Sequence, residues 1–286
     1  MKALIDLPEE YHEGFSTMKR YGYNYAQGQR EKDLKDSFEQ FVFCRGPDSE
    51  LRVFAVGSSD GNSDIPIIET LTIKHSSIKY IVVEPAECQI KKFQNLVTSK
   101  TEVGLWTNIN FEFHQTTIEE YLNKIESGKA TGGFDIIHLL NSAYYLDDPE
   151  RVSMELYGHL NTGGMLFYTL LVGAWEKIYR RIAGVVPIPM LPGSGALREI
   201  LKRRIPDVKM HTRYREGRFK ATECFREDSK DGNLILNFLV QIHDFRKAAP
   251  PEVVSDFMDS FKGSCFEVND DLYFPSDEED IVIVKE

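Results

Sequence analysis

The feature that most constrains the fold is a repeated alternation of short apolar runs with helix-like segments. The apolar runs cover residues 51–57, 78–84, 108–114, 134–140 and 163–171. Runs such as FDIIHLL are apolar almost throughout, which is typical of strands buried on both faces of a sheet. Parallel strands need long crossover connections, usually helices. The sequence therefore predicts an α/β fold, a Rossmann-like, doubly wound and mostly parallel sheet covered by helices.

The segments outside this alternation predict how the chain is organised. We expect further strands at 208–214, 219–225 and 281–284, a helix at 233–245, and a short acidic loop at 276–280. Two segments lie outside the pattern, residues 1–50 before the first strand and residues 172–205, and the second is rich in Pro and Gly. The predicted organisation is a helical lid or substrate segment at 1–50, a cofactor-binding core at 51–171, a substrate lid at 172–205, and the C-terminal part of the sheet at 206–286.

Composition excludes several classes of partner. The net charge of −11 opposes general attraction to nucleic acid phosphates. No apolar run approaches the ~20 residues that span a bilayer, and the N-terminus has no signal-peptide core. The four cysteines (Cys44, Cys88, Cys224 and Cys265) show neither a disulfide nor a zinc-binding pattern. We expect a cytosolic protein with reduced thiols, no metal, no nucleic acid partner and no membrane attachment.

Two strand ends predict a nucleoside site. Gly57 ends the first strand and Gly61 follows in the loop, so the backbone can turn sharply and approach a ligand. Glu84 ends the second strand, where a carboxylate can accept both hydroxyl protons of a ribose. A nicotinamide dinucleotide would use the same geometry, but the third glycine of its GxGxxG motif is missing. A nucleoside without a pyrophosphate, such as S-adenosylmethionine, fits better.

Motifs along most of the chain resemble a known family. The Tyr144–Tyr145 pair after the fourth strand and the Gly163–Gly164 turn before the fifth resemble the class I methyltransferase pattern. Five segments resemble the histamine N-methyltransferase family in order and spacing: VVEPAECQIKKFQ, FDIIHLLNSAYYLDDPE, GAWEKIYRR, DGNLILNFL and KAAPPEV. The resemblance implies a Rossmann-like methyltransferase domain with a small substrate domain. It also implies a soluble monomer that binds S-adenosylmethionine and methylates a ring nitrogen of a small molecule.

The same resemblance implies the cofactor residues. Ile118 stands where the family has serine, so a contact there would come from the backbone. Carried over by position, the cofactor residues are Gly57, Glu84, Gln89, Thr117, Ile118 and Leu140.

The substrate residues that the resemblance implies are altered. Asn24 stands in place of a glutamate, Asn141 in place of a glutamine, and Ser276 in place of an asparagine, beside the acidic Asp277 and Glu278. The aromatic positions persist as Tyr144, Tyr145 and Trp175, with Tyr179 replacing a second tryptophan. We expect a small, flat or cationic amine as substrate, with Asn24 and Asn141 orienting the attacking nitrogen and the aromatic rings excluding water.

Plainer interpretations stand beside these. Tyr144, Tyr145 and Trp175 could be packing residues, and Asn24 could belong to a turn. His138 lies inside an apolar strand, which favours a buried, hydrogen-bonded histidine over a catalytic base, and His114 is assigned no role.

Three functions compete. The first is an N-methyltransferase that acts on a small amine or imidazole. The second is a methyltransferase with another acceptor, such as a hydroxyl, a guanidine or a peptide side chain. The third is a non-catalytic protein that binds the cofactor or its demethylated product as a sensor, which the loss of three polar substrate contacts suggests.

Overall fold

The computed structural model describes residues 1–22, 27–41, 49–186, 190–205 and 207–286. These residues divide into two compact units. One, the sheet unit, comprises residues 28–170, 196–213 and 280–286. The other, the three-stranded unit, comprises residues 1–27, 171–195 and 214–279. Asn24, predicted to contact the substrate, lies outside the described residues.

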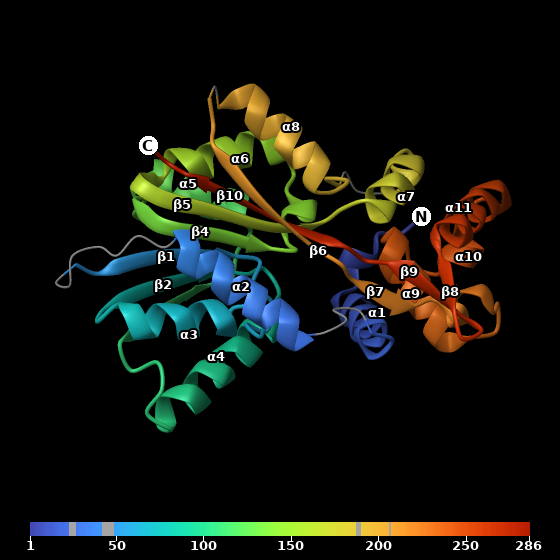
Figure 1. Cartoon of the computed structure of the whole chain (residues 1–286), viewed down its shortest axis with the longest axis horizontal. Helices are drawn as coiled ribbons and strands as arrows, with labels where there is room; N and C mark the ends of the chain where they lie inside the picture. Colours follow the sequence, from blue (N-terminus) through green and yellow to red (C-terminus); the bar gives the residue numbers. More distant parts are fainter. Residues whose placement is uncertain (23–26, 42–48, 187–189, 206) are drawn as a thin grey trace. The chain divides into compact units, whose positions relative to one another are not determined.

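A seven-stranded sheet carries the order β3-β2-β1-β4-β5-β10-β6 (Figure 1). β1 pairs in parallel with β2 and β4, β2 pairs in parallel with β3, and β4 pairs in parallel with β5. The strand order reverses between β1 and β4, so a ligand crevice is expected beyond the carboxyl ends of these strands. The strands are β1 (Leu51–Val56), β2 (Ile78–Val83), β3 (Ile109–His114), β4 (Phe134–Leu140), β5 (Leu160–Leu171), β6 (Met210–Arg215) and β10 (Glu278–Val284).

Helices pack on both faces of this sheet. Consecutive strand residues point to opposite faces. Val53 packs in the buried cluster that contains Phe38 of α2 and Phe93 of α4, whereas the neighbouring Phe54 stacks on Phe134 and tilts against Tyr121 of α5. The predicted α/β fold is therefore confirmed. The helices of this unit are α2 (Gln27–Phe41), α3 (Ile65–Lys74), α4 (Glu87–Glu102), α5 (Ile118–Glu126), α6 (Pro149–Gly158) and α8 (Ser194–Arg204), with a 3-10 turn, η2, at Ala143–Tyr145.

The three-stranded unit is built around phenylalanine side chains. Phe219, Phe261 and Phe274 are fully buried and contact one another, with ring centroids 4.9–6.5 Å apart. The antiparallel sheet has the order β7-β9-β8, from β7 (Arg218–Lys220), β8 (Phe266–Val268) and β9 (Asp271–Pro275). Its helices are η1 (Leu4–Asp6), α1 (Pro8–Arg20), α7 (Ala174–Ile182), η3 (Thr222–Phe225), α9 (Lys230–Val240), α10 (Phe245–Ala248) and α11 (Pro251–Ser264).

Local hydrogen bonding overrides two of the predicted elements. The strand expected at 219–225 ends at Lys220, because Cys224 N–H donates to Ala221 O and closes the 3-10 helix η3. The helix expected at 233–245 runs from Lys230 only to Val240, since Gln241 has the left-handed φ of 57° that ends helices.

The acidic loop expected at 276–280 is wrong from Glu278 onward. Residues 278–280 begin β10 and are buried. Buried carboxylates need partners. Arg215 Nη2 lies 3.2 Å from Glu278 Oε2, and Thr169 Oγ1 donates to Asp280 Oδ1 at 2.7 Å. These partners are distant in sequence, so the local charge pattern concealed the strand.

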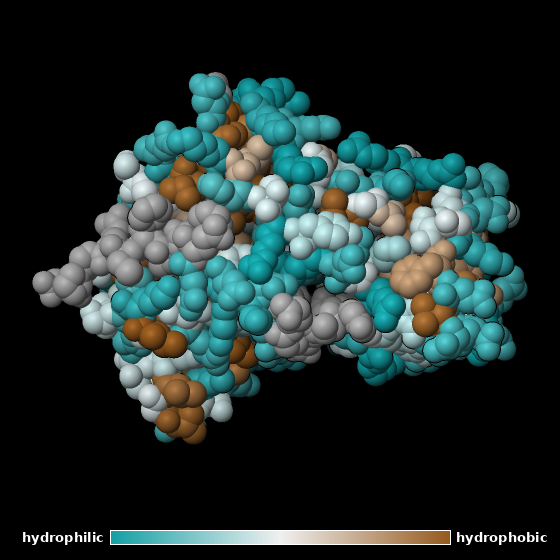
Figure 2. All heavy atoms as spheres, viewed as in Figure 1, coloured by the Kyte–Doolittle hydropathy of each residue, from teal (hydrophilic) through white to brown (hydrophobic). Residues whose placement is uncertain are grey.

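The face of the molecule in Figure 2 is mostly hydrophilic, in keeping with the net charge. Apolar atoms gather around the end of α4, in whose neighbourhood Val103 and Leu105 are exposed. Among the described residues, no helix is long and apolar enough to cross a membrane.

Candidate functional site

The loop after β1 brings its backbone close to two other elements. Gly57 and Gly61 have φ of 68° and 79°, and Ser59 adopts a left-handed φ of 51°. A Cβ on Gly57 would lie 2.5 Å from the Cβ of Ser142, and one on Gly61 would lie 2.3 Å from the ring of Phe93. Both glycines are therefore required by backbone conformation and by close packing.

Glu84 closes this loop from β2. Ser59 N–H donates to Glu84 Oε2 and Ala86 N–H donates to Oε1, each at 2.9 Å. The side chain is almost fully buried, and burial raises its pKa while the two backbone donors act in the opposite direction. A carboxylate oxygen has two lone pairs, so each oxygen can accept a further hydrogen bond. The predicted grouping of the glycine loop with Glu84 is present, and it fits a ligand with two adjacent hydroxyls.

The other predicted cofactor residues follow neighbouring strands. Gln89 lies in the first turn of α4 after β2, Thr117 precedes α5 after β3, and Leu140 ends β4. The Thr117 hydroxyl accepts from Glu120 N–H at 3.2 Å in a capping box, so its main structural role is to start α5. Gln89, Ile118 and Leu140 are buried. Their contact with a cofactor stays a prediction.

The segment after β4 carries three predicted substrate residues. Asn141 has a left-handed φ of 54°, and its N–H donates to Thr169 O at 2.9 Å. Tyr144 OH donates to Asn141 Oδ1 at 3.3 Å, and the Tyr144 and Tyr145 rings meet edge to face. The Tyr144 hydroxyl thus orients the Asn141 amide, and the contact of Asn141 with a substrate stays a prediction. Sequence reasoning missed Ser142, whose hydroxyl donates to Val56 O at 2.7 Å and ties this segment to β1.

The remaining predicted substrate residues lie in the three-stranded unit. Trp175 and Tyr179 of α7 stack with ring centroids 5.8 Å apart, and Trp175 meets Phe274 edge-on at 6.2 Å. Tyr179 OH lies 3.1 Å from Met190 Sδ. Ser276 is buried, and its hydroxyl has no hydrogen-bond partner among the described residues. The structure brings together Asn141 with Tyr144 and Tyr145 in the sheet unit, and Trp175 with Tyr179 in this unit.

A carboxylate accompanies this aromatic group. Asp277 Oδ1 accepts from Gly217 N–H at 3.0 Å, and the Tyr214 hydroxyl also donates to this carboxylate. Asp277 Oδ2 lies 3.9 Å from the position that a Cβ on Gly173 would take, two residues before Trp175. A negative charge therefore lies at the start of the helix that carries the aromatic side chains.

The two histidines considered from sequence have structural partners. His138 is fully buried, as predicted, with Nε2 2.8 Å from Tyr80 OH, and burial lowers its pKa to about 3. His114 Nε2 lies 2.7 Å from Glu112 Oε1. Neither histidine is assigned a role in catalysis.

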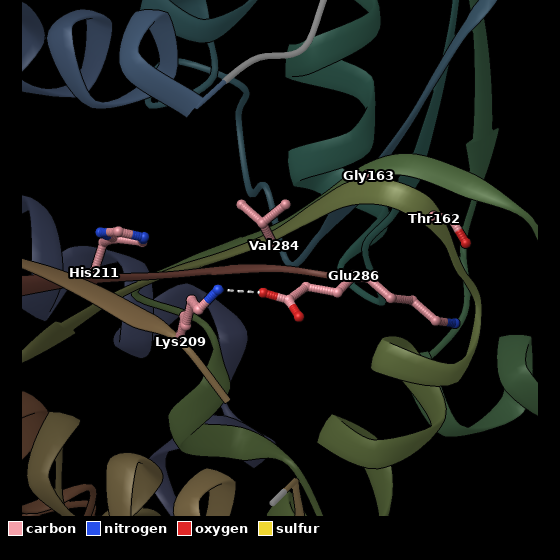
Figure 3. Close-up of a pocket in the computed structure, with 7 residues that line it drawn as sticks. Thr162, Gly163, Lys209, His211, Val284 and Glu286 are labelled. Atoms are coloured by element: carbon pink, nitrogen blue, oxygen red, sulfur yellow. Dashed lines mark hydrogen bonds and ion pairs between the residues drawn. The ribbon is translucent and has the colours of Figure 1, made fainter. Parts of the chain in front are cut away.

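A separate pocket lies where β5 begins and β10 ends (Figure 3). Its lining includes Gly163, His211 and Val284, and Lys209 Nζ lies 2.6 Å from Glu286 Oε1 there. The carboxyl ends of β1, β2 and β4 contribute none of its lining residues, so it is distinct from the glycine loop. No cluster of His, Cys, Asp and Glu side chains suited to a metal ion occurs in the part of the chain that the structure describes.

Curated relatives with similar sequences are histamine N-methyltransferases. The protein from Cavia porcellus is 25% identical over 285 residues, covering 93% of this chain and 91% of the relative. The protein from Bos taurus is 24% identical, covering 90% of this chain and 89% of the relative. The chain is therefore similar to histamine N-methyltransferases over most of its length. The predicted resemblance is confirmed along nearly the whole length, although no protein-family model matches the chain.

Solved structures with similar folds include bacterial proteins. The YcgJ protein from Bacillus subtilis superposes with a TM-score of 0.55 at 11% identity, covering 89% of this chain and 99% of that one. A putative methyltransferase from Bacillus halodurans gives a TM-score of 0.54 at 14% identity, covering 87% of this chain and 97% of that one. The fold is that of class I methyltransferases. Together with the homology, it supports a methyltransferase that uses S-adenosylmethionine, the cofactor expected from the sequence.

Proposed function

We propose that this protein transfers a methyl group from S-adenosylmethionine to a nitrogen of a small amine or imidazole. The observation that carries the proposal is the Glu84 carboxylate, which two backbone N–H groups hold beside the glycine loop. That geometry suits the two hydroxyls of a ribose and includes no third glycine for a pyrophosphate. The names of the curated relatives support the nitrogen acceptor.

The residues of the sheet unit would bind the cofactor and orient the acceptor. Glu84 would accept hydrogen bonds from the ribose hydroxyls. The rest of the cofactor would contact Gln89, Thr117, Ile118 and Leu140. When bound, S-adenosylmethionine supplies an electrophilic methyl group. Asn141, oriented by Tyr144 OH, would hydrogen-bond the acceptor. A second contact from Asn24, which lies outside the described residues, stays a prediction. Alignment of the nitrogen with the methyl group can lower the activation free energy by about 7 kcal/mol for a well-oriented pair.

The three-stranded unit supports a cationic or flat substrate. Trp175 and Tyr179 are buried and stack on each other, and their rings would attract a cation that bound beside them; the Asp277 carboxylate near the start of their helix would add to this attraction. The attacking nitrogen itself must be neutral, because a protonated amine has no lone pair. A substrate with an ammonium group at one end and a neutral nitrogen at the other satisfies both conditions, and a histamine-like amine has this form.

No side chain of the described residues is assigned as a general base. His138 is buried in the core, and His114 is paired with Glu112. A neutral imidazole nitrogen needs no base before attack, and the product cation can lose its proton to water. The roles of Asn24 and Asn141 are therefore to position the substrate.

Transfer of label from methyl-labelled S-adenosylmethionine tests the function. The acceptor panel contains histamine, histidine, small dipeptides, and simple mono- and diamines, and products are identified by mass. Turnover of histamine above the other acceptors would extend the homology to the substrate. Turnover of another amine with histamine inert would mean that Asn24, Asn141 and Ser276 define a different preference. The proposal is wrong if no amine or imidazole is methylated at a rate above background.

Two alternatives remain as outcomes of the same experiment. Methylation confined to hydroxyls or guanidines would assign a different acceptor class. Binding of the cofactor without turnover of any acceptor would favour a sensor. The alterations at the three polar substrate positions favour these alternatives, whereas the retained aromatic residues favour the amine. The monomeric state, the cytosolic location and the lid role of residues 1–50 and 172–205 stay predictions.

A further inference from the structure

A second polar group lies beneath the glycine loop, inside the core of the sheet unit. Asp64, Tyr80 and His138 are fully buried. Tyr80 OH lies 2.8 Å from Asp64 Oδ1 and 2.8 Å from His138 Nε2, so the tyrosine hydroxyl joins the carboxyl and the imidazole. The three residues come from the end of the glycine loop, from β2 and from β4.

This network is connected to the proposed ribose carboxylate through two consecutive serines. Ser58 Oγ donates to Asp64 Oδ1 at 2.9 Å, and the next residue, Ser59, donates its N–H to Glu84 Oε2 at 2.9 Å. Ser59 has a left-handed φ of 51°, a conformation that a residue with a side chain rarely adopts unless its neighbours hold it there. The buried network holds Ser58 on one side of this residue, and Glu84 holds the backbone on the other.

As a purely structural element, this network would lower the stability of the folded state. Asp64 Oδ2 and His138 Nδ1 are buried and have no hydrogen-bond partner among the residues that the structure describes. A buried polar atom without a partner destabilises the folded state. An apolar core at these positions would avoid that penalty. The arrangement is therefore better explained by what it fixes than by its contribution to stability.

We propose that Asp64, Tyr80 and His138 form a positioning network that holds Ser58, and through it the Ser59 backbone, in the conformation that binds the cofactor. The inference rests on the proposed function, since it assigns the network to the cofactor site. Asp64 is the central positioning residue, because it accepts from both Ser58 and Tyr80. None of the three core residues needs to touch the cofactor.

Two variants interrupt the network at different places. Tyr80→Phe removes the hydroxyl that joins Asp64 to His138 but keeps the ring in the core. Ser58→Ala removes the connection between the network and the loop. The matched control is Tyr168→Phe, because Tyr168 is also a fully buried tyrosine of the same sheet, with its hydroxyl donating to Ser153 Oγ at 3.2 Å. The control loses a buried hydroxyl that does not lead to the loop.

The dissociation constants of S-adenosylmethionine and of its demethylated product are measured by titration calorimetry on the full chain, beside the thermal midpoint. We expect Tyr80→Phe and Ser58→Ala each to weaken binding about tenfold, the equivalent of about 1.4 kcal/mol. Tyr168→Phe should lower the thermal midpoint as much as Tyr80→Phe but leave the affinity unchanged. With an acceptor identified, KM for the cofactor should rise while kcat at saturating cofactor stays constant.

The double variant tests whether the two residues act through one network. Ser58→Ala should weaken binding by less than twofold when it is added to Tyr80→Phe, because the connection is already interrupted. Unchanged affinity in both single variants would overturn the inference, as would equal losses in Tyr80→Phe and Tyr168→Phe. Wild-type protein that binds neither cofactor form would instead reject the proposed function, so the two failures are distinguishable.

Discussion

The Ser59 backbone N–H donates to Glu84 Oε2 at 2.9 Å, and this bond joins the loop after β1 to the end of β2. Ala86 N–H occupies the other carboxylate oxygen at the same distance. The carboxylate is therefore fixed before any ligand binds, and a ligand with two hydroxyls would lose little free energy in ordering it.

Glu84→Gln should weaken binding of S-adenosylmethionine about thirtyfold, or about 2 kcal/mol, as for loss of a hydrogen bond to a charged group. The amide would also place an NH2 group against one of the two backbone N–H donors. Calorimetric titration measures the effect. Glu87→Gln is the control, since Glu87 lies three residues on, is exposed and pairs with Lys91. Wild-type affinity in Glu84→Gln would show that the ribose lies elsewhere.

Gly61→Ala should destabilise the fold by about 3 kcal/mol, from a left-handed φ together with a clash against Phe93. Gly128→Ala separates these two causes, because Gly128 has a φ of 71° but nothing within 4 Å of an added Cβ. That control should lose only about 1 kcal/mol. Urea unfolding followed by circular dichroism gives both values. Equal losses would mean that the close approach to Phe93 contributes nothing.

Much of the fold could be predicted because its signals are local. Apolar runs such as 134–140, whose predicted bounds match β4, carry their burial in their own composition. The glycine loop and Glu84 were predictable for a similar reason, since strand ends and turn residues mark them. Such features need no knowledge of distant partners.

What could not be predicted depends on partners far apart in sequence. From sequence, Asp64 looks like a loop residue. Its buried position follows only from Ser58 and Tyr80, which bond to it, and from His138, which bonds to Tyr80. The sequence around Glu278 predicts an exposed side chain, because its partner Arg215 is distant in sequence. Phe274, which meets Trp175, had no recognisable motif at all. A polar residue within an apolar strand, such as His138, was the one signal of the network available from sequence.

Asp277→Asn should lower kcat/KM for a cationic amine about tenfold and leave a neutral acceptor of similar size nearly unchanged. The amide keeps an oxygen for Gly217 N–H but removes the charge near the aromatic helix. Initial rates over a range of acceptor concentrations measure the ratio. Asp259→Asn, an exposed position on α11, is the control for the loss of one charge. An equal effect on both acceptors would contradict a charge-recognising role for Asp277.

Asp64 and His138 should make opposite contributions to the pH dependence of stability. Burial raises the pKa of Asp64 to about 7 from 3.8, with Asp60 and Glu84 adding smaller effects in the same direction. The folded state then binds the extra proton between these values, so this group's contribution to stability falls as pH rises from about 4 to 7. Burial lowers the pKa of His138 to about 3 from 6.5, so its contribution rises with pH over about 3 to 6.5.

In the wild-type protein the two contributions largely cancel between pH 4 and 6.5, where both groups are neutral in the folded state and both are charged in the unfolded chain. In Asp64→Asn only the histidine contributes, so the free energy of unfolding should rise with pH across this window. In His138→Phe only the carboxyl contributes, so the free energy of unfolding should fall with pH. Each slope should be about 1.4 kcal/mol per pH unit, which adds up to a few kcal/mol across the window. Urea unfolding at half-unit pH steps measures all three proteins. Parallel pH profiles for wild type and both variants would mean that Asp64 and His138 titrate as they do in the unfolded chain, and that the core does not hold them as a neutral pair.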